Sequence, residues 1–271
     1  MLVIANWKMH KTVVEAVATA RQIRSLVRRV PVTVVIAPSF TALERIGRVL
    51  RGGPVQLAAQ DVHWESWGAF TGAVSPLQLR DVGCQWAIIG HSERRRLFGE
   101  SDAVAGLKVG AALAHRLRPI LCVGETLKER AGGDTLRVVE RQLERGLVAA
   151  TAATAGRMVV AYEPVWAIGT GETAEPAQIQ EAHGLIRRWL DGRFGAATSR
   201  RIPILYGGSV SPENIQRLGA VAELNGVLVG GAALAAEPLA EIVRVLAGAP
   251  ANAKPKRKTA VRRTAKSNRS H

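Results

Sequence analysis

The chain has 271 residues, of which 47% are hydrophobic, and a formal net charge of +15. This length suits one large domain, because α/β barrels of about 250 residues form around a single core. No apolar run reaches the roughly 18 residues of a membrane span, so we expect no membrane contact. The first residues begin an apolar strand at once, without room for a signal peptide, and we therefore expect a cytoplasmic location.

The positive charge is concentrated at the C-terminal end. Residues 249–271 contain four Lys, four Arg and no acidic residue, so the other residues carry a net +7. This composition predicts a disordered tail, because it offers too little apolar surface to offset the ordering entropy. We predict a folded domain over residues 1–248. The tail either keeps the protein soluble or contacts nucleic acid or another polyanion, although it lacks aromatic residues for base stacking.

Short apolar runs alternate with amphipathic segments along the domain. The runs predict eight strands, over Leu2–Ala5, Val32–Ala37, Val55–Ala59, Trp86–Gly90, Ile120–Val123, Met158–Tyr162, Ile202–Tyr206 and Leu224–Val229. Helices are predicted over Val13–Arg29, Ala103–His115, Leu136–Ala150, Ala177–Phe194 and Pro238–Leu246, with shorter ones after Ser39, Ser75 and Ser211. Capping patterns at Thr12, Ser75 and Ser211 mark helix starts.

Eight alternating units of this kind predict an α/β protein with a single closed (β/α)8 barrel. An open doubly wound sheet is the alternative. Its dinucleotide-binding form needs a glycine-rich turn after the first strand, where this chain has Asn6, Trp7 and Lys8. Cys84 and Cys122 lie in apolar surroundings, which favours buried thiols over a disulfide or a metal cluster. The barrel is therefore the better interpretation.

Polar side chains follow several of the predicted strands. Asn6 and Lys8 follow the first, His91 and Glu93 the fourth, and Glu163 the sixth. Active sites of such barrels lie at the carboxyl ends of the strands. A lone lysine is often a solvated charge and a lone histidine is often structural. Here the helix expected after His91 disfavours a protonated imidazole, which suits a neutral hydrogen-bond donor.

The segment 161–171 joins a carboxylate to a loop that is suited to closing over it. Pro164 stops the strand just after Glu163, the candidate base, and residues 166–168 form an apolar tip. Gly169 and Gly171 provide hinge positions. The pattern predicts a lid.

Two glycine pairs follow the last two strands. Gly207 and Gly208 precede Ser209, and Gly230 and Gly231 follow Val229. Each pair alone is compatible with a tight turn. Together they lie where this architecture commonly binds phosphate through backbone N–H groups.

Five segments resemble the triosephosphate isomerase family: residues 5–9, 89–95, 161–171, 206–210 and 228–232. The resemblance spans residues 2 to about 247 and includes the order of the motifs. It implies a TIM barrel that interconverts dihydroxyacetone phosphate and D-glyceraldehyde 3-phosphate in glycolysis and gluconeogenesis. Proton transfer would pass through an enediolate, without a metal or organic cofactor. Another phosphate-binding barrel isomerase or lyase would share the glycines but would not need the other motifs.

The resemblance also implies residue roles. Glu163 would move the proton, His91 would donate to the carbonyl oxygen, and Lys8 would stabilise negative charge, with Asn6 supporting that site. Glu93 would pair with Lys8. Backbone N–H groups of Gly169, Ser209, Gly230 and Gly231 would hold the phosphate. Thr71, Trp166 and Tyr206 would support the site.

The loop Gln60–Gly72 resembles the family segment that inserts into a second subunit, which implies a homodimer through residues 64–72. Thr71 would then reach towards Asn6 and Lys8 of the partner. The alternative is an ordinary surface loop, but Trp64, Trp67 and Phe70 together would then be an aggregation liability.

Four positions depart from the family pattern. Ala73 replaces a glutamate that would pair with an arginine after His91, and Glu172 occupies a hinge position that is often basic. Asn225 replaces an aspartate and Ala233 a serine. The change at Ala73 concerns the interface between subunits, and the change at Glu172 concerns the lid. The changes at Asn225 and Ala233 concern local hydrogen bonding.

Overall fold

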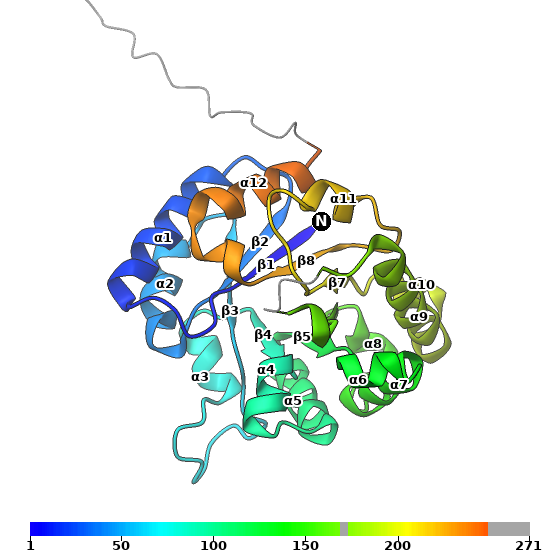
Figure 1. Cartoon of the computed structure of the whole chain (residues 1–271). Coiled ribbons are helices and arrows are strands. Elements are labelled where there is room, and N and C mark those ends of the chain that lie inside the picture. Colours follow the sequence, from blue (N-terminus) through cyan, green and yellow to red (C-terminus); the bar gives the residue numbers. More distant parts are fainter. Residues whose placement is uncertain (169–172, 249–271) are drawn as a thin grey trace, which may run out of the picture.

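The computed structural model describes residues 1–168 and 173–248, and these form the predicted (β/α)8 barrel. Eight parallel strands close in sequence order, with β8 paired to β1. Figure 1 shows the helices arranged around this barrel. The strands are β1 (Leu2–Asn6), β2 (Thr33–Ala37), β3 (Val55–Ala59), β4 (Trp86–Ile89), β5 (Arg118–Val123), β6 (Val159–Tyr162), β7 (Ile204–Tyr206) and β8 (Gly226–Val229).

Twelve α-helices and three short 3₁₀ helices connect the described strands. The α-helices are α1 (Val13–Leu26), α2 (Leu43–Leu50), α3 (Pro76–Asp81), α4 (Ser92–Phe98), α5 (Asp102–Ala114), α6 (Leu127–Ala131), α7 (Thr135–Gly146), α8 (Ala152–Ala155), α9 (Pro176–Phe194), α10 (Ala196–Ser199), α11 (Ile215–Gly219) and α12 (Ala236–Leu246). The 3₁₀ helices are η1 (Phe40–Ala42), η2 (Val165–Ala167) and η3 (Gly231–Leu234). None of the helices described is both long and apolar enough to span a bilayer.

Alternate residues of each strand face two separate apolar layers. Leu2 and Ile4 of β1 belong to the cluster inside the barrel, whereas Val3 and Ala5 belong to the larger cluster between the sheet and the helices. Both faces of every strand are therefore covered, which explains why the strands are almost continuously apolar. This packing fixes where each strand ends and thus where the following polar residue lies.

The predicted order of strands and main helices is confirmed. The differences are at element ends and in the short helices α6, α8 and α10, which the sequence analysis did not predict. Helix α1 ends at Leu26, three residues before the predicted end, because Pro31 follows and the chain turns with Val30 N–H donating to Val27 O. The helix predicted directly after Ser211 begins instead at Ile215. The Asn214 side chain accepts the Ser211 N–H at 2.9 Å and so stabilises a turn there.

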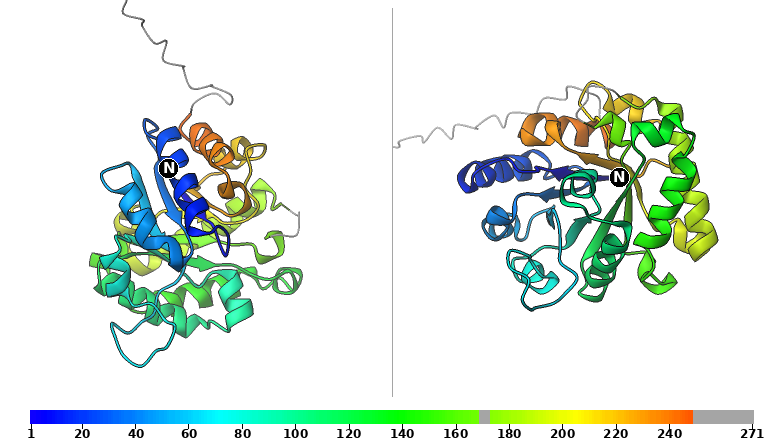
Figure 2. Two further views of the ribbon diagram at one scale, coloured as in Figure 1. Left: turned by 90° about the vertical axis from the view of Figure 1, so that its left-hand side faces the viewer. Right: turned by 60° about the horizontal axis from the view of Figure 1, so that its bottom comes forward.

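The loop between β3 and α3 extends beyond the ring of helices, as both views show (Figures 1 and 2). The other βα connections surround the carboxyl end of the barrel. The predicted tail, 249–271, and the predicted hinge residues Gly169, Gly171 and Glu172 lie outside the described residues.

Candidate active site

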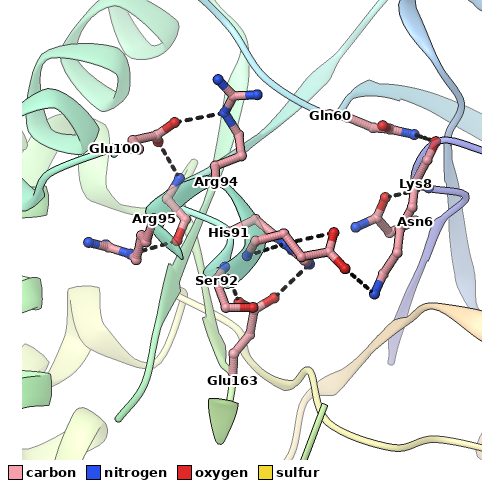
Figure 3. A network of polar contacts seen from close by, with 11 residues as sticks. Asn6, Lys8, Gln60, His91, Ser92, Arg94, Arg95, Glu100 and Glu163 are labelled. Atoms are coloured by element: carbon pink, nitrogen blue, oxygen red, sulfur yellow. Dashed lines mark hydrogen bonds and ion pairs between the residues drawn. The ribbon is translucent and has the colours of Figure 1, made fainter. Parts of the chain in front are cut away.

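Glu163 and His91 face each other at the ends of β6 and β4. The Glu163 side chain is buried, and its Oε2 accepts the Ser92 N–H at 2.8 Å. Its Oε1 lies 3.1 Å from Nε2 of His91, and within the described part of the chain this oxygen has no hydrogen bond of good geometry. Figure 3 shows the two side chains pointing toward one another. Oε2 of Glu163 is therefore fixed by a backbone hydrogen bond, whereas Oε1 is available to accept a proton.

The protonation of His91 follows from its place before helix α4. As the N-cap residue, it accepts the Glu93 N–H at Nδ1, at 3.2 Å. An imidazole that accepts at Nδ1 carries its proton on Nε2 when neutral. The nitrogen that faces Glu163 is thus the N–H donor, as the sequence interpretation requires.

Lys8 lies at the opposite side of the same opening. Its Nζ donates to Oε1 of Glu93 at 2.7 Å, the contact that the family resemblance implies. Partial burial opposes the charge on Glu93, but the hydrogen bond from Lys8 and the positive charge of Lys8 outweigh it and lower the pKa of Glu93. Glu93 therefore stays ionised and fixes the ammonium position.

The backbone of Lys8 is held in an uncommon conformation. Its φ is 50°, in the left-handed region that non-glycine residues rarely adopt. Asn6 Oδ1 accepts the Lys8 N–H at 3.0 Å, and Gln60 Nε2 donates to the Lys8 carbonyl at 2.9 Å. Gln60 also donates to Ala37 O at 2.8 Å. These bonds stabilise a turn that directs Lys8 toward the opening.

A cavity of about 410 Å³ joins these groups. Asn6, Lys8, His91 and Glu163 line one part of it, and residues after β7 and β8 line the rest. The latter include three of the four residues predicted to hold phosphate, together with neighbouring glycines: Gly207, Gly208, Ser209, Gly230 and Gly231. This size suits a small ligand, and the lining combines positive charge with exposed backbone.

Two of the glycines are required by close approach. A Cβ on Gly207 would lie 2.9 Å from Cγ of Glu163, and one on Gly208 would lie 2.2 Å from the Tyr206 hydroxyl. Side chains at these positions would displace the carboxylate or the tyrosine. The glycines therefore shape the wall of the cavity as well as its turns.

A second buried carboxylate, Glu125, anchors the start of the predicted lid. It accepts the Tyr162 hydroxyl at 3.0 Å and the Trp166 indole N–H at 3.1 Å, and Arg130 pairs with it at 3.1 Å. The Arg130 guanidinium also lies 5.1 Å from the centre of the Trp166 ring. Trp166 is thus tied to the end of β5 through one carboxylate.

The Tyr206 hydroxyl, at the end of β7, is buried next to Gly208. Within the described residues it has no hydrogen bond of good geometry, although the backbone of Ala174 and of Ser209 is near. Burial raises the pKa of Tyr206 to about 12, and the nearby backbone groups oppose this shift. Its hydroxyl is therefore protonated at neutral pH.

Buried charges support the start of helix α4. Glu100 accepts the Gly90 N–H at 2.8 Å and pairs with Arg94 at 2.8 Å and Lys108 at 2.6 Å. Asp61 pairs with the same two cations, at 2.9 and 2.6 Å. Because Gly90 and Arg94 flank His91, this network fixes the segment that carries the imidazole.

Ala73 cannot pair with an arginine, and Arg94, one of the arginines after His91, pairs with Asp61 and Glu100 of its own chain. At Asn225, Oδ1 accepts the Ile204 N–H at 2.8 Å and an N–H of Arg187 at 3.2 Å. Arg187 also pairs with Glu223, at 2.8 Å. Ala233 is buried in the apolar layer outside the barrel.

The predicted site residues thus fall into three groups. Around the cavity lie Asn6, Lys8, His91, Glu163, Ser209, Gly230 and Gly231, with Glu93 bonded to Lys8. Trp166 and Tyr206 do not line the cavity: Trp166 bonds to Glu125, and the Tyr206 hydroxyl is buried against Gly208. Thr71 is exposed on the projecting loop, and Gly169 lies outside the described residues.

Sequence reasoning missed Gln60, Ser92, Glu100 and Glu125. Gln60 and Glu125 follow strands directly, so the rule that found Glu163 could have found them. Ser92 acts through its backbone N–H, and Glu100 lies in a loop between two helices. Neither position can be recognised by its place after a strand. In the described part of the chain, no group of three or more His, Cys, Asp or Glu side chains is placed to hold a metal ion.

Comparison with known proteins agrees with this geometry. The family model described as "Triosephosphate isomerase" matches residues 1–246. Proteins named triosephosphate isomerase from Roseiflexus castenholzii and Citrifermentans bemidjiense are 50% and 49% identical to the chain, and each alignment covers 90% of this chain and 97% of the relative. The crystal structure of triosephosphate isomerase from Bartonella henselae has a TM-score of 0.82 and 38% identity, and it covers 90% of this chain and 98% of its own. The chain belongs to the triosephosphate isomerase family.

Proposed function

We propose that this protein is a triose-phosphate isomerase that interconverts dihydroxyacetone phosphate and D-glyceraldehyde 3-phosphate. The observation that carries the proposal is the pair Glu163 and His91, with Oε1 and Nε2 3.1 Å apart beside a cavity that Lys8 also lines. A base and a neutral donor that face the same small volume suit proton transfer next to a carbonyl group. The family membership supports the same reaction.

In this proposal Glu163 takes a proton from the carbon that bears the hydroxyl group in dihydroxyacetone phosphate. The electrons of that C–H bond form the carbon–carbon double bond of an enediolate, and the carbonyl oxygen gains the negative charge. Return of a proton to the adjacent carbon, with transfer of the hydroxyl proton between the oxygens, gives the aldehyde. No atoms are gained or lost. Oε1 of Glu163 is the oxygen that would take the first proton, because among the described residues it accepts no hydrogen bond of good geometry.

His91, Lys8 and Asn6 stabilise the enediolate oxygen. The Nε2–H of His91 donates to it, and the Lys8 ammonium, fixed by Glu93, lies on the other side of the cavity. Such donors are effective because they are already oriented before charge develops.

The phosphate lies against the ends of β7 and β8. Backbone N–H groups of Ser209, Gly230 and Gly231 donate to it. Gly169, the fourth donor that the family resemblance implies, lies outside the described residues. Gly230 lies close to Lys8, since a Cβ there would be 3.4 Å from Cε of Lys8. The ammonium is therefore near enough to compensate phosphate charge as well. Trp166 and Tyr206 support closure of the lid over this site, which excludes water.

The test is a coupled assay of glyceraldehyde 3-phosphate conversion, on wild type and Glu163→Asp. The shorter side chain withdraws the base, and general-base contributions are about 10²- to 10⁴-fold in rate. We expect robust wild-type turnover and a loss of this order in a variant whose circular dichroism is unchanged. An inactive but folded wild type would refute the reaction, and an unchanged variant would refute the role of Glu163.

We also propose a homodimer through residues 64–72. Trp67 is 79% exposed and Phe70 42% exposed in the single chain, beside a hollow of about 600 Å³ between this loop and α3. Apolar side chains on a projecting loop are costly in water and favour a partner surface. In the dimer Thr71 would approach Asn6 and Lys8 of the second chain. A cytoplasmic location remains our prediction from the sequence.

A further inference from the structure

The end of the barrel opposite the active site is rich in arginine. The connections that join each helix to the next strand form this end, which we call the amino-terminal face. They are residues 27–32, 51–54, 82–85, 115–117, 147–158, 195–203 and 220–225. The arginines of this face are Arg28, Arg29, Arg51, Arg116, Arg157, Arg200 and Arg201. Glu223 is the one acidic residue in these described connections, and it pairs with Arg187 at 2.8 Å.

The connections at the catalytic end are mainly acidic. Their described residues carry six carboxylates, at Asp61, Glu65, Glu125, Glu163, Glu175 and Glu213, and two lysines, Lys8 and Lys11. These residues are scattered along the sequence, and only closure of the barrel sorts them onto one end and the arginines onto the other. The resulting charge asymmetry favours approach of a polyanion to the amino-terminal face.

Most of these arginines are available to a partner. Six are exposed, and Arg157, half-buried, donates to Leu113 O at 2.8 Å. Among the described residues, none of the six exposed arginines forms an ion pair. The N-terminal amino group of Met1 lies at the same end, immediately before β1. Binding an anion here would therefore not require an internal ion pair to break.

The chain continues from this same end into its basic segment. Helix α12 runs antiparallel to the strands and ends at Leu246, beside α1, whose end leads to Arg28 and Arg29 (Figure 1). The sequence after residue 248 adds eight positive charges and no negative charge. Exposed arginines and basic segment are thus joined at one end of the molecule.

We propose that the amino-terminal face binds the phosphate backbone of double-stranded nucleic acid without reading its sequence, and that the eight positive charges in the sequence after residue 248 strengthen this binding. Guanidinium groups bind phosphate oxygens through paired N–H donors. The basic segment has no aromatic residue for stacking on unpaired bases and, apart from Val261, no large apolar residue to enter a lipid surface. Both observations favour a duplex over single strands or membranes.

The test measures binding of a fluorescent 24-base-pair DNA duplex of arbitrary sequence to the full-length protein at two salt concentrations. One variant replaces Arg28, Arg29, Arg200 and Arg201 by Gln. A matched control replaces four exposed basic residues on helices away from this face, at Arg21, Arg45, Lys128 and Arg188, so the net charge is equal. A third variant keeps the full length but replaces the eight Lys and Arg residues after position 248 by Gln.

We expect wild-type binding to weaken steeply with salt, because each phosphate contact contributes about 0.9 to the slope of log K against log salt. The variant of the amino-terminal face should bind the duplex at least about tenfold more weakly, and the slope of log K against log salt should decrease in magnitude by up to about 3.6. The control variant should keep most of the wild-type affinity and most of the wild-type slope. The third variant should also bind more weakly. Unchanged isomerase activity in all variants would show that they are folded, since none of these residues lies at the active site.

Three results would overturn the proposal. One is no binding by wild type at low salt. Another is equal loss in the face variant and its charge-matched control, which would mean that only net charge matters. The third is tighter binding to vesicles with anionic lipid than to the duplex, which would identify a membrane surface as the partner.

Discussion

Gly124, at the end of β5, lies directly against the backbone of Glu163. A Cβ on Gly124 would be 1.8 Å from the Glu163 carbonyl oxygen, far inside any allowed contact. Gln142 fixes Gly124 from the other side, with Nε2 donating to Gly124 O at 3.1 Å and Oε1 accepting its N–H at 2.7 Å. The position of the proposed base therefore depends on a glycine 39 residues earlier in the chain.

Gly124→Ala should impair turnover because Glu163 must move. A displacement of about 1 Å at a reacting group costs on the order of 10²-fold. We expect a fall of this order in kcat, measured by the coupled assay. Gly192→Ala is the control, because no atom lies within 4 Å of a Cβ there, and it should leave kcat unchanged. Equal activity of both variants would show that the site tolerates the shift.

Gln60→Leu should disturb Lys8 without unfolding the barrel. The change removes the donor to the carbonyls of Lys8 and Ala37, so the left-handed turn at Lys8 loses its support. Leaving such groups unpaired costs about 1 to 3 kcal/mol, and we expect kcat/KM to fall at least about tenfold. Gln180→Leu, at an exposed position of α9, is the control. A drop in Tm alone, with kcat/KM intact, would contradict a role in positioning Lys8.

Replacing Trp67 and Phe70 by Ser should shift the protein from dimer to monomer. These side chains supply exposed apolar area on the projecting loop. Sedimentation equilibrium should then give half the wild-type mass at the same concentration. Val148→Ser removes a residue that is 69% exposed at the other end of the barrel, and it should leave the mass unchanged. A wild type that sediments as a monomer would exclude the proposed assembly.

Stability should decrease in mild acid because of His183. This residue of α9 is fully buried, its ring lies 6.1 Å from that of Tyr162, and both ring nitrogens lack a partner among the described residues. Burial lowers the pKa of His183 from 6.5 to about 4, with Arg187 adding to the shift and the Glu223 backbone opposing it.

The sign follows from which state binds the proton. Between pH 6.5 and about 4 the unfolded chain protonates His183 while the folded chain does not, so the free energy of unfolding decreases as the pH is lowered from 6.5 to about 4. A shift of this size corresponds to about 3 kcal/mol. Urea unfolding at several pH values should show this slope in wild type, and His183→Phe should reduce it. An identical slope in the variant would assign the dependence to other groups.

The barrel, and the gathering of the candidate site residues around one cavity, could be predicted from the sequence because both depend on local pattern. Glu163, His91 and Lys8 follow apolar strands, and the carboxyl ends of parallel strands meet at one end. Gln60 and Glu125 also follow strands, but their partners are distant in sequence, so their importance appears only after closure. The hydrogen bond that fixes Oε2 of Glu163 could not be predicted, because its donor is the backbone N–H of Ser92 and any residue type at that position could supply it.

The strands of the barrel also separate two surfaces that share no residue. The proposed chemistry uses the carboxyl ends and the connections after them, whereas the exposed arginines lie where the strands begin. Substitutions at one end can therefore accumulate without altering the geometry at the other. An enzyme built in this way can gain or lose an attachment to other molecules while natural selection keeps its catalytic residues fixed.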